Sequence, residues 1–317
     1  MAGVTLAQQL QGHAQVSLFE KSRGYGGRLS VRRQNNWQFD HGAQFFTARS
    51  PEFQQQVATL LEAGVIAQWE PKIVTLTPKE KPFKRAWYEP HYVAVPGMSN
   101  VVKQLASALD VNLETRVHAI HRYRKGWLLQ DEEGRALGEF DLVVTALPAP
   151  QSAGIMPPQF TDHDLLANVQ YSPCFAFMLG FDQPLDLNFG AAVVRESPLA
   201  WIAVENSRPG RPTMSSLVLH SDNKWAADHF EQPDIESHLL TAIAELEGIE
   251  IPAPAHVAMH RWRYARVENE NTPGVLWDEE QGLAACGDWT HGKRVEDAFL
   301  SGLSLGKQIK AFLATRV

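Results

Sequence analysis

Along the first twenty residues, the spacing of apolar positions changes from a helix pattern to a strand pattern. Four apolar residues in the segment 1–10 fall on one side of a helix: Val4, Leu6, Ala7 and Leu10. Gly12 is placed to end that helix, and residues 15–19 alternate as a short strand. The strand leads into Glu20 and Lys21. A helix followed by a strand with an acid at its end is half of a dinucleotide-binding unit.

The next part of the chain predicts a helix, a small meander and a buried strand. A helix over residues 100–109 has Ser99 before it as a candidate N-cap. Three short alternating strands follow, over residues 112–115, 117–124 and 127–130. Residues 140–147 form a nearly continuous apolar run that Pro148 stops. Such a run is typical of a strand buried on both faces in a parallel sheet.

From residue 151 to residue 273 the pattern changes to strands followed by helices, which we interpret as an α+β substrate domain. The expected elements are strands over 174–181, 201–205 and 215–220, and helices near Lys224 and over 235–246. Residues 69–92 contain four prolines at turns and join this domain as an excursion. Segments 1–68, 93–150 and 274–317 then form one discontinuous Rossmann-like domain with a doubly wound sheet. The predicted fold class is therefore α/β.

Composition narrows the classes of function. The 317 residues, 44% apolar and 21% charged, are enough for two packed domains. A net charge of −7 argues against a nucleic-acid binder, which needs a basic face. Cys174 and Cys286 can build neither a disulfide framework nor a thiolate zinc site, so we expect a reducing cytoplasm. No membrane span or secretory signal is visible, and a small-molecule partner is expected.

Two polar turns offer groups for a phosphate and for a planar ring. Residues 23–29 contain Gly26 and Gly27 followed by Arg28. Backbone N–H groups at glycines can approach a phosphate closely, and the guanidinium adds charge, although a plain surface turn is the competing interpretation. Residues 40–46 read Asp-His-Gly-Ala-Gln-Phe-Phe, a small-residue turn with an amide and two aromatics that is suited to lining a planar ring.

The start of the chain matches only the end of the dinucleotide fingerprint. In that fingerprint a GxGxxG turn places the pyrophosphate on a helix N-terminus, and an acid about 20 residues further on accepts the ribose hydroxyls. Glu20 lies 17 residues after Gly3, but Met1-Ala2-Gly3 supplies only the last three positions. Our hypothesis is that Met1 is an internal methionine of a longer GxGMAG segment. A chain that truly starts at Met1 is expected to retain its cofactor weakly and to be poorly stable.

Separated motifs at both ends of the chain carry a family resemblance. Gly3, Glu20-Lys21, Gly26-Gly27-Arg28 and residues 40–45 together resemble the N-terminal third of the flavin-containing amine oxidase superfamily. The form DHGAQFF is closest to the renalase-like branch of that superfamily. Residues 285–289, ACGDW, and 295–299, VEDAF, resemble its closing strand, turn and helix.

The resemblance implies FAD as the cofactor. Binding is expected to be noncovalent, because neither cysteine stands where some amine oxidases attach the flavin through a thioether. Gly287-Asp288 would meet the FAD chain, and the helix that starts near Val295 would face the flavin pyrimidine, where its dipole stabilises negative charge. Arg116-Val117 resembles the strand whose backbone contacts adenine. The implied cofactor contacts are Ala2, Gly3, Glu20, Lys21, Gly27, Arg28, Gln44, Phe45, Val117, Gly287, Asp288, Val295 and Ala298.

The renalase-like branch implies an oxidase acting on a dihydronicotinamide isomer of NAD(P)H. Hydride passes to flavin N5, and O2 takes the electrons to give H2O2. Such a substrate becomes aromatic when it loses the hydride, so no strong base is required and no catalytic residue is assigned. Trp201, Trp262 and Tyr264 are candidates for an aromatic wall at the substrate. Two alternatives stay open: a flavin amine oxidase or desaturase on another small substrate, and a noncatalytic nucleotide-binding protein whose fingerprint is truncated.

Two competing motifs have better structural explanations. Residues 302–306 match the GxSxG hydrolase pattern, but they lie inside a helix expected over 295–313 with no histidine downstream, so we expect close packing instead. His256 and His260 share one side of a strand, with no carboxylate or cysteine at ligand spacing, so no metal is expected.

Basic and aromatic residues alternate over residues 261–266. This pattern occurs in strands that bind nucleic acids, but the acidic net charge favours another role. We expect one face of the strand to pack and the other to place Arg261 or Arg263 near an anionic substrate or a flavin phosphate.

Overall fold

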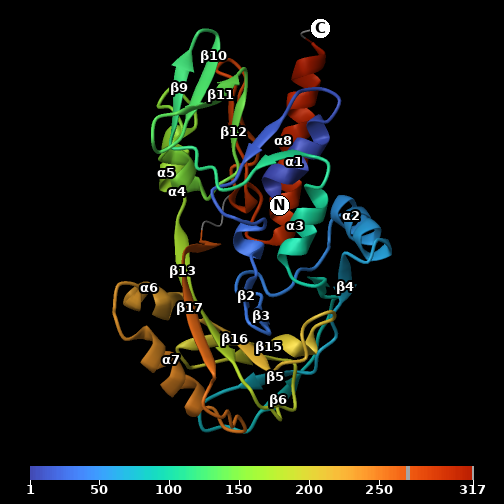
Figure 1. Ribbon diagram of the computed structural model, residues 1–317, viewed down its shortest axis with the longest axis vertical. Coiled ribbons are helices and arrows are strands. Elements are labelled where there is room, and N and C mark those ends of the chain that lie inside the picture. Colours follow the sequence, from blue (N-terminus) through green and yellow to red (C-terminus); the bar gives the residue numbers. More distant parts are fainter. Residues whose placement is uncertain (269–271, 316–317) are drawn as a thin grey trace.

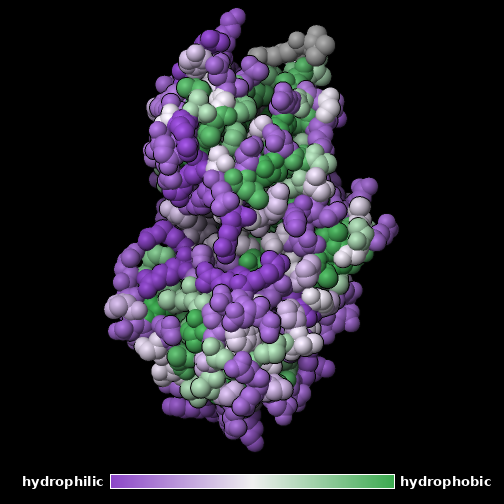
Figure 2. Space-filling view, viewed as in Figure 1, coloured by the Kyte–Doolittle hydropathy of each residue, from purple (hydrophilic) through white to green (hydrophobic). Residues whose placement is uncertain are grey.

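The computed structural model describes residues 1–268 and 272–315 and shows two lobes along its longest axis (Figure 1). One lobe, here called the helical lobe, contains both ends of the chain, the long helix α8 and the meander β9–β11. The other, here called the sheet lobe, is built on a seven-stranded sheet covered by α6 and α7. Hydrophilic residues cover most of the face shown in Figure 2 and gather across the waist between the lobes. No helix in the described part of the chain is long and apolar enough to cross a membrane.

Helices α1 (Ala2–Leu10) and α8 (Val295–Ala314) pack against each other at the centre of the helical lobe. Their contact depends on glycines: a Cβ on Gly302 would lie 2.3 Å from the carbonyl oxygen of Ala2, and one on Gly306 would lie 2.6 Å from Cβ of Gln9. The small residues of the GxSxG match therefore serve close helix packing, as expected.

Parallel strands lie between this helix pair and the meander. Strand β1 (Ser17–Phe19) pairs in parallel with β8 (Asp110–Asn112), and β12 (Val143–Thr145) pairs in parallel with β19 (Leu283–Ala285). Strand β18 (Leu276–Asp278) completes the second group as an antiparallel edge. Apolar residues of α1 and α8 cluster with β19, while residues from β9, β10, β12 and β19 form a second core with the following helices. This layering confirms the predicted α/β class.

Three sequence predictions in this lobe need correction. The meander consists of β9 (Ala119–Tyr123), β10 (Gly126–Gln130) and β11 (Ala136–Phe140); of the strand expected at 112–115, only Asn112 is in a strand, at the end of β8 beside β1. Of the apolar run 140–147, Phe140 ends β11 and only Val143–Thr145 form a strand, β12. Helix α3 (Ser99–Leu105) is shorter than expected, and its N-cap is Met98, without a side-chain cap.

The sheet lobe has the strand order β17-β13-β16-β15-β14-β5-β6, with only the β14–β5 pair parallel. The bounds of these strands are β5 Ile73–Leu76, β6 Phe83–Arg85, β13 Tyr171–Gly180, β14 Ala191–Val194, β15 Leu199–Val204, β16 Ser216–Ser221 and β17 His256–Val267. Helices α6 (Asn223–His229) and α7 (Ile235–Ala244) bury one face of the sheet in a large apolar core. The opposite face meets the hairpin of β2 (Arg32–Gln34) and β3 (Trp37–Phe39).

Shorter elements connect the lobes. Strands β4 (Ile66–Gln68) and β7 (Tyr92–Ala94) pair with each other, and β5 and β6 lie between them in the chain. The remaining helices are α2 Pro51–Glu62, α4 Ala149–Ala153 and α5 His163–Asn168. The segment 69–92 thus supplies two strands to the sheet lobe, as its assignment to the substrate domain requires. The exact domain boundaries stay a prediction.

The α1–α8 contact gives a direct test of the packing. Replacing Gly302 by Ala forces a methyl group against the backbone of Ala2, and we expect the free energy of unfolding to fall by about 1–3 kcal/mol. Gly154 ends helix α4 with a negative φ, and a Cβ there would meet atoms no closer than 3.5 Å, so Gly154→Ala is the control. Urea unfolding followed by circular dichroism measures both variants. Equal stability of the two variants would contradict the close contact.

Candidate cofactor and substrate site

The glycine turn after β1 lies against the closing turn of the chain through an ion pair. Arg28 follows Gly26 and Gly27, which have φ of 126° and 56°, in the left-handed range that favours glycine. Its Nη1 donates to Oδ2 of Asp288 at 2.9 Å, and its Nη2 donates to Oδ1, so the pair is bidentate. Asp288 is buried, whereas Arg28 is partly exposed. Two motifs 260 residues apart in the sequence therefore meet in one place.

The N-terminus of α1 lies near the Arg28–Asp288 ion pair. The amino group of Met1 interacts electrostatically with Glu20, Arg28 and Asp288. A Cβ on Gly3 would lie 3.1 Å from Cβ of Ala146 and 3.8 Å from the side chain of Leu18, so the first turn of α1 lies between the two parallel strand groups. Ala2 is buried in this turn.

Glu20 and Lys21 end β1 beside that turn. The Glu20 carboxylate accepts a hydrogen bond from the backbone N–H of Ser22 at 2.8 Å, and Lys21 is exposed. The predicted position of Glu20 at the end of a parallel strand, near a helix N-terminus, is therefore the one found.

The Asp-His-Gly segment packs on the backbone of Arg28. The N–H of Ala43 donates to the carbonyl oxygen of Arg28 at 2.8 Å, and a Cβ on Gly42 would lie only 2.0 Å from that same oxygen. No other residue type fits at position 42 without moving one of the two segments. The ring-binding and phosphate-binding turns proposed from the sequence are thus held together by a glycine contact.

The N-terminus of α8 is fixed by two acidic residues that sequence reasoning did not single out. Asp297 accepts hydrogen bonds from the N–H groups of Lys293 and Arg294 at 2.8 Å. Glu296 is buried and accepts from the backbone N–H groups of Arg49 and Ser50 and from the Ser50 hydroxyl. The partner of Glu296, Ser50, lies 246 residues away in the sequence, so no local pattern could identify it.

The predicted contacts around α8 lie at this end of the helix. The N–H of Gly287 donates to the Ser301 hydroxyl at 3.0 Å, which ties the turn to α8. Val295 packs beside the large core that contains Phe46 and Phe299, and Ala298 packs beside the α1–α8 core. The positive end of the α8 dipole therefore lies next to the Gly287-Asp288 turn.

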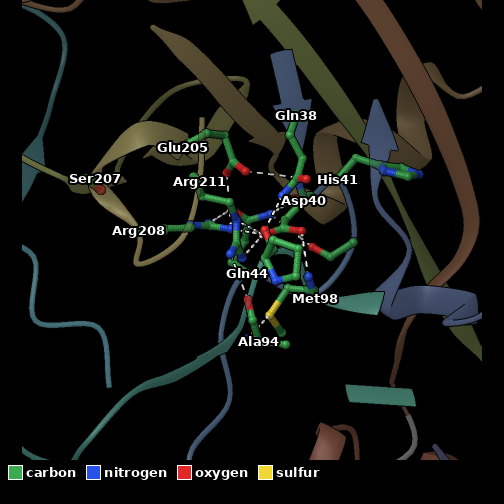
Figure 3. A network of polar contacts seen from close by, with 12 residues as sticks. Gln38, Asp40, His41, Gln44, Ala94, Met98, Glu205, Ser207, Arg208 and Arg211 are labelled. Atoms are coloured by element: carbon green, nitrogen blue, oxygen red, sulfur yellow. Dashed lines mark hydrogen bonds and ion pairs between the residues drawn. The ribbon is translucent and has the colours of Figure 1, made fainter. Parts of the chain in front are cut away.

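A buried network of charged groups joins the lobes at Asp40 (Figure 3). Oδ2 of Asp40 accepts from Nη1 of Arg208 at 3.0 Å and from Nε of Arg211 at 3.1 Å, and Arg211 also donates through Nη2. Oδ1 accepts from the N–H of Met98 at 2.9 Å, and the N–H of Asp40 donates to Glu205. The Asp40, Arg208 and Arg211 side chains have no exposed surface.

Gln44 belongs to this network as well. Its Oε1 accepts from Nη2 of Arg208 at 2.6 Å and from Nε1 of Trp201 at 3.3 Å, while its Nε2 donates to the carbonyl oxygens of Asp40 and Gly42. The sequence resemblance proposed Gln44 as a cofactor contact. Because the protein itself satisfies both ends of the amide, a contact to the cofactor from this position would come from the backbone rather than from the side chain.

The sheet face opposite α6 and α7 presents a row of rings to this segment. The register places Trp201 opposite His220, His220 opposite Ala176 and Ala176 opposite His260, so one row crosses β15, β16, β13 and β17. Paired residues in a sheet point to the same face. Because Ala176 is small, Trp201 and the two histidines are the large side chains of this row.

The predicted aromatic residues contact the Asp-His-Gly segment from this face. Nε1 of Trp262 donates to the carbonyl oxygen of His41 at 2.9 Å, and the two rings are stacked with centroids 5.4 Å apart. The ring centroid of Phe45 lies 5.7 Å from that of Trp201 and 4.3 Å from that of His91. Tyr264 lies further along β17, with its ring 5.5 Å from Tyr171. Trp201 and Trp262 are thus brought to one site, and Tyr264 lies beside it.

Val117 lies just before β9, which begins at Ala119 rather than at residue 117, and packs beside the core under the meander; its contact with adenine stays a prediction. Arg261 donates to the carbonyl oxygens of Phe230 and Gln232, and Arg263 pairs with Glu231. Both arginines lie on the α6 side of the sheet, so the prediction that one of them faces an anionic substrate or flavin phosphate was wrong.

Burial alters the proton affinities in the site. Burial, with smaller contributions from His260 and Arg32, lowers the pKa of His41 to about 4, and burial also lowers the pKa of His220 and His91 to about 4. Burial raises the pKa of Glu205 to about 7, opposed by the charge of Arg208. The histidines are therefore neutral at physiological pH.

These residues fit FAD, since groups of the required kinds converge. The Gly27 Cβ position has no atom within 4 Å, so there is open space beside this glycine of the turn that ends in Arg28. Cys174 and Cys286 are free and buried, and burial raises the pKa of each thiol to about 12, in keeping with noncovalent binding. Among the residues the structure describes, no three His, Cys, Asp or Glu side chains are grouped to hold a metal.

Comparisons with known proteins agree with this geometry. Residues 84–308 match the family described as flavin containing amine oxidoreductase, and residues 1–62 match an NAD(P)-binding Rossmann-like domain. Mouse renalase is 24% identical over 339 residues, covering 99% of this chain and 96% of that protein. Cyclohexylamine oxidase from Brevibacterium oxydans has a similar structure, with a TM-score of 0.74, 12% identity, and coverage of 99% and 97% of the two chains. The structure of putrescine oxidase with bound putrescine has a TM-score of 0.72 and 12% sequence identity, and the match covers 98% of this chain and 97% of that chain.

The Asp40 network generates a stability prediction. Replacing Asp40 by Asn leaves Arg208 and Arg211 buried without their shared anion, and we expect the free energy of unfolding to fall by about 3–5 kcal/mol. Asp186→Asn, at an exposed position, is the control and should change it by less than about 0.5 kcal/mol. Both are measured by urea unfolding at pH 7.5. A loss of under 1 kcal/mol in Asp40→Asn would show that the network is not a main support of the fold.

The lowered histidine pKa values predict acid instability. An imidazole with a pKa of about 4 in the folded protein stays neutral while the same group in the unfolded chain takes up a proton below pH 6.5. Proton uptake therefore favours the unfolded chain, and the free energy of unfolding falls as the pH falls from 6.5 to 4. Glu205 acts in the opposite sense, since its raised pKa costs stability as the pH rises from 4.5 to about 7. Three imidazoles outweigh one carboxyl, so net stability should fall on acidification.

His220→Gln isolates one of these groups. The stability lost between pH 7.5 and 5.0 should be smaller than in the unmodified protein by about 2 kcal/mol, because glutamine takes up no proton. His121→Gln, exposed on β9, is the matched control and should leave the pH dependence unchanged. If His220→Gln loses as much stability on acidification as the control does, His220 is protonated in the folded protein.

Proposed function

Because the chain belongs to the flavin containing amine oxidoreductase family, we propose that it oxidises a dihydronicotinamide isomer of NAD(P)H, with O2 as the electron acceptor. Family membership makes it an FAD-dependent oxidoreductase. Its similarity to renalase extends over nearly the whole of both chains and supports an oxidase of this branch. The substrate itself is argued below from the residues at the site.

The observation that carries the proposal is the chemistry of the sheet face that meets residues 41–44. Trp201 and Trp262 donate their indole N–H groups to Gln44 and to the His41 backbone, and His220 and His260 stand in the same register row as Trp201. These side chains are planar and uncharged, since burial lowers the histidine pKa values. Such a wall suits a planar heterocycle, and a substrate that becomes aromatic on oxidation needs no strong base.

Charge argues against a conventional amine substrate. A protonated amine is bound best by a free carboxylate, but Asp40 and Glu205 are engaged by Arg208 and Arg211, and Asp288 is engaged by Arg28. The site therefore favours a neutral or anionic molecule.

FAD, when bound, accepts two electrons and a proton equivalent from the substrate and returns the electrons to O2, which yields H2O2. The residues of this chain supply position and charge. Gly26, Gly27 and the first turn of α1 offer backbone N–H groups to the phosphates, and Glu20 at the end of β1 is placed for ribose hydroxyls. The N-terminus of α8 directs its positive end to the flavin edge. The ring wall holds the substrate on the side of the sheet lobe.

The test is anaerobic mixing of the yellow protein with candidate reductants, followed by absorbance near 450 nm. We expect dihydronicotinamide isomers to bleach the flavin rapidly, ordinary NADH to act much more slowly, and amines such as putrescine to have no effect. On return of O2 the colour should recover with one H2O2 formed per substrate oxidised.

Two outcomes would contradict the proposal. Bleaching by an amine alone would make the protein a conventional amine oxidase. A purified protein that stays colourless after incubation with FAD would favour the noncatalytic alternative.

A further inference from the structure

Arg32 has a positive charge with no partner at the waist between the lobes. It begins β2 and is half-buried, and its side chain makes no hydrogen bond or ion pair with any residue that the structure describes. It stands opposite Phe39 in the β2–β3 hairpin, and the Phe39 ring lies 5.8 Å from His256 on β17. Because residues paired in this way point to the same face, the Arg32 side chain extends toward β17.

A cluster of rings lies within reach of this charge. The ring of His41 lies 5.1 Å from that of His260 and 5.4 Å from that of Trp262, and the His260 and Trp262 rings are 4.1 Å apart. The charge of Arg32 acts on both histidines and contributes, after burial, to lowering their pKa values. Ser30, two residues before Arg32, lies 3.2 Å from Nε2 of His41, so the start of β2 lies beside this ring cluster.

His41 offers a hydrogen-bonding group that the protein leaves unused. It is 6% exposed, and its Nδ1 is buried with no partner among the described residues. Its Nε2 lies 3.2 Å from the Ser30 hydroxyl. When Ser30 donates to Nε2, the proton of the neutral imidazole resides on Nδ1, a buried donor that interacts with the Phe39 backbone without forming a hydrogen bond of good geometry. A buried donor of this kind is costly unless a ligand or water satisfies it.

The charge balance points to the sign of that ligand. Three buried carboxylates of the site, Asp40, Glu205 and Asp288, each have an arginine partner, and Glu20 accepts a hydrogen bond from the Ser22 N–H. Arg32 is therefore a cation that nothing in the described site neutralises. The Arg32 side chain is only half-buried, so part of it is open to solvent.

We propose that Arg32, with His41 and His260, binds a phosphate group of the nucleotide substrate and so selects phosphorylated dihydronicotinamides over their ribosides. The proposal rests on the function proposed above and adds the subsite that recognises the anionic end of the substrate. A guanidinium beside imidazole donors is a favourable arrangement for a phosphate, because charge-assisted hydrogen bonds are about twice as strong as neutral ones.

The test is equilibrium binding of two oxidised ligands, nicotinamide mononucleotide and nicotinamide riboside, to the FAD-loaded protein by calorimetry. We expect the unmodified protein to bind the mononucleotide at least tenfold more tightly. Arg32→Ala should weaken mononucleotide binding tenfold or more and change riboside binding less than twofold, and Arg32→Lys should retain part of the preference. Arg124→Ala removes an equal charge from the exposed end of the meander and should leave both affinities unchanged.

The outcomes separate this subsite from the proposed reaction. Equal affinities for the two ligands, or an equal loss for both in Arg32→Ala, would overturn the subsite even if dihydronicotinamides bleach the flavin. An Arg32-dependent preference for the mononucleotide without any bleaching would uphold the subsite and overturn the proposed oxidation. Loss of the preference in Arg124→Ala as well would attribute it to overall charge rather than to Arg32.

Discussion

The buried carboxylate of Asp40 is the constraint on which the rest of the site depends. It accepts hydrogen bonds from Arg208 and Arg211 of the sheet lobe and from the backbone of Met98 at the start of α3. Charges removed from water are tolerated only when they are paired and fully hydrogen-bonded, so the three groups can be buried only together. The ion pairs of Asp40 therefore link the two lobes and fix the position from which residues 41–46 continue.

The segment that follows Asp40 makes two further sets of contacts, one with the glycine turn at Arg28 and one with the sheet. On one side, Gly42 packs on the Arg28 backbone, and the Arg28–Asp288 pair brings in the closing turn. On the other side, Gln44 and the His41 backbone accept the indole N–H groups of Trp201 and Trp262. The segment 40–46 thus contacts both the glycine turn at Arg28 and the two tryptophans of the sheet. A substitution in this segment would therefore disturb both sets of contacts.

Sequence reasoning succeeded where the signal was local. The helix–strand–acid order at the start, the glycine turn before Arg28 and the helix after Gly287-Asp288 each follow from a short pattern, and the structure brings Glu20, Arg28 and Asp288 to one place. It failed where the partner was distant. Glu205, Arg208 and Arg211 lie more than 160 residues from Asp40, and Glu296 lies 246 residues from Ser50, so no pattern identified them. Similarly, β8 pairs with β1 across more than 90 residues, which a meander pattern cannot reveal.

The strand β17 shows why even a correct local pattern can be assigned to the wrong face. The period of two in a strand separates Arg261 and Arg263 from His260, Trp262 and Tyr264, and the sequence displays that alternation clearly. Which set faces the site is decided by α6: its following segment supplies the Phe230 and Gln232 carbonyls and Glu231 to the two arginines. Their aliphatic stems also lie over the Phe175 and Phe230 rings, which favours this face further. The rings of His260 and Trp262 are therefore left on the opposite face, where they contact His41.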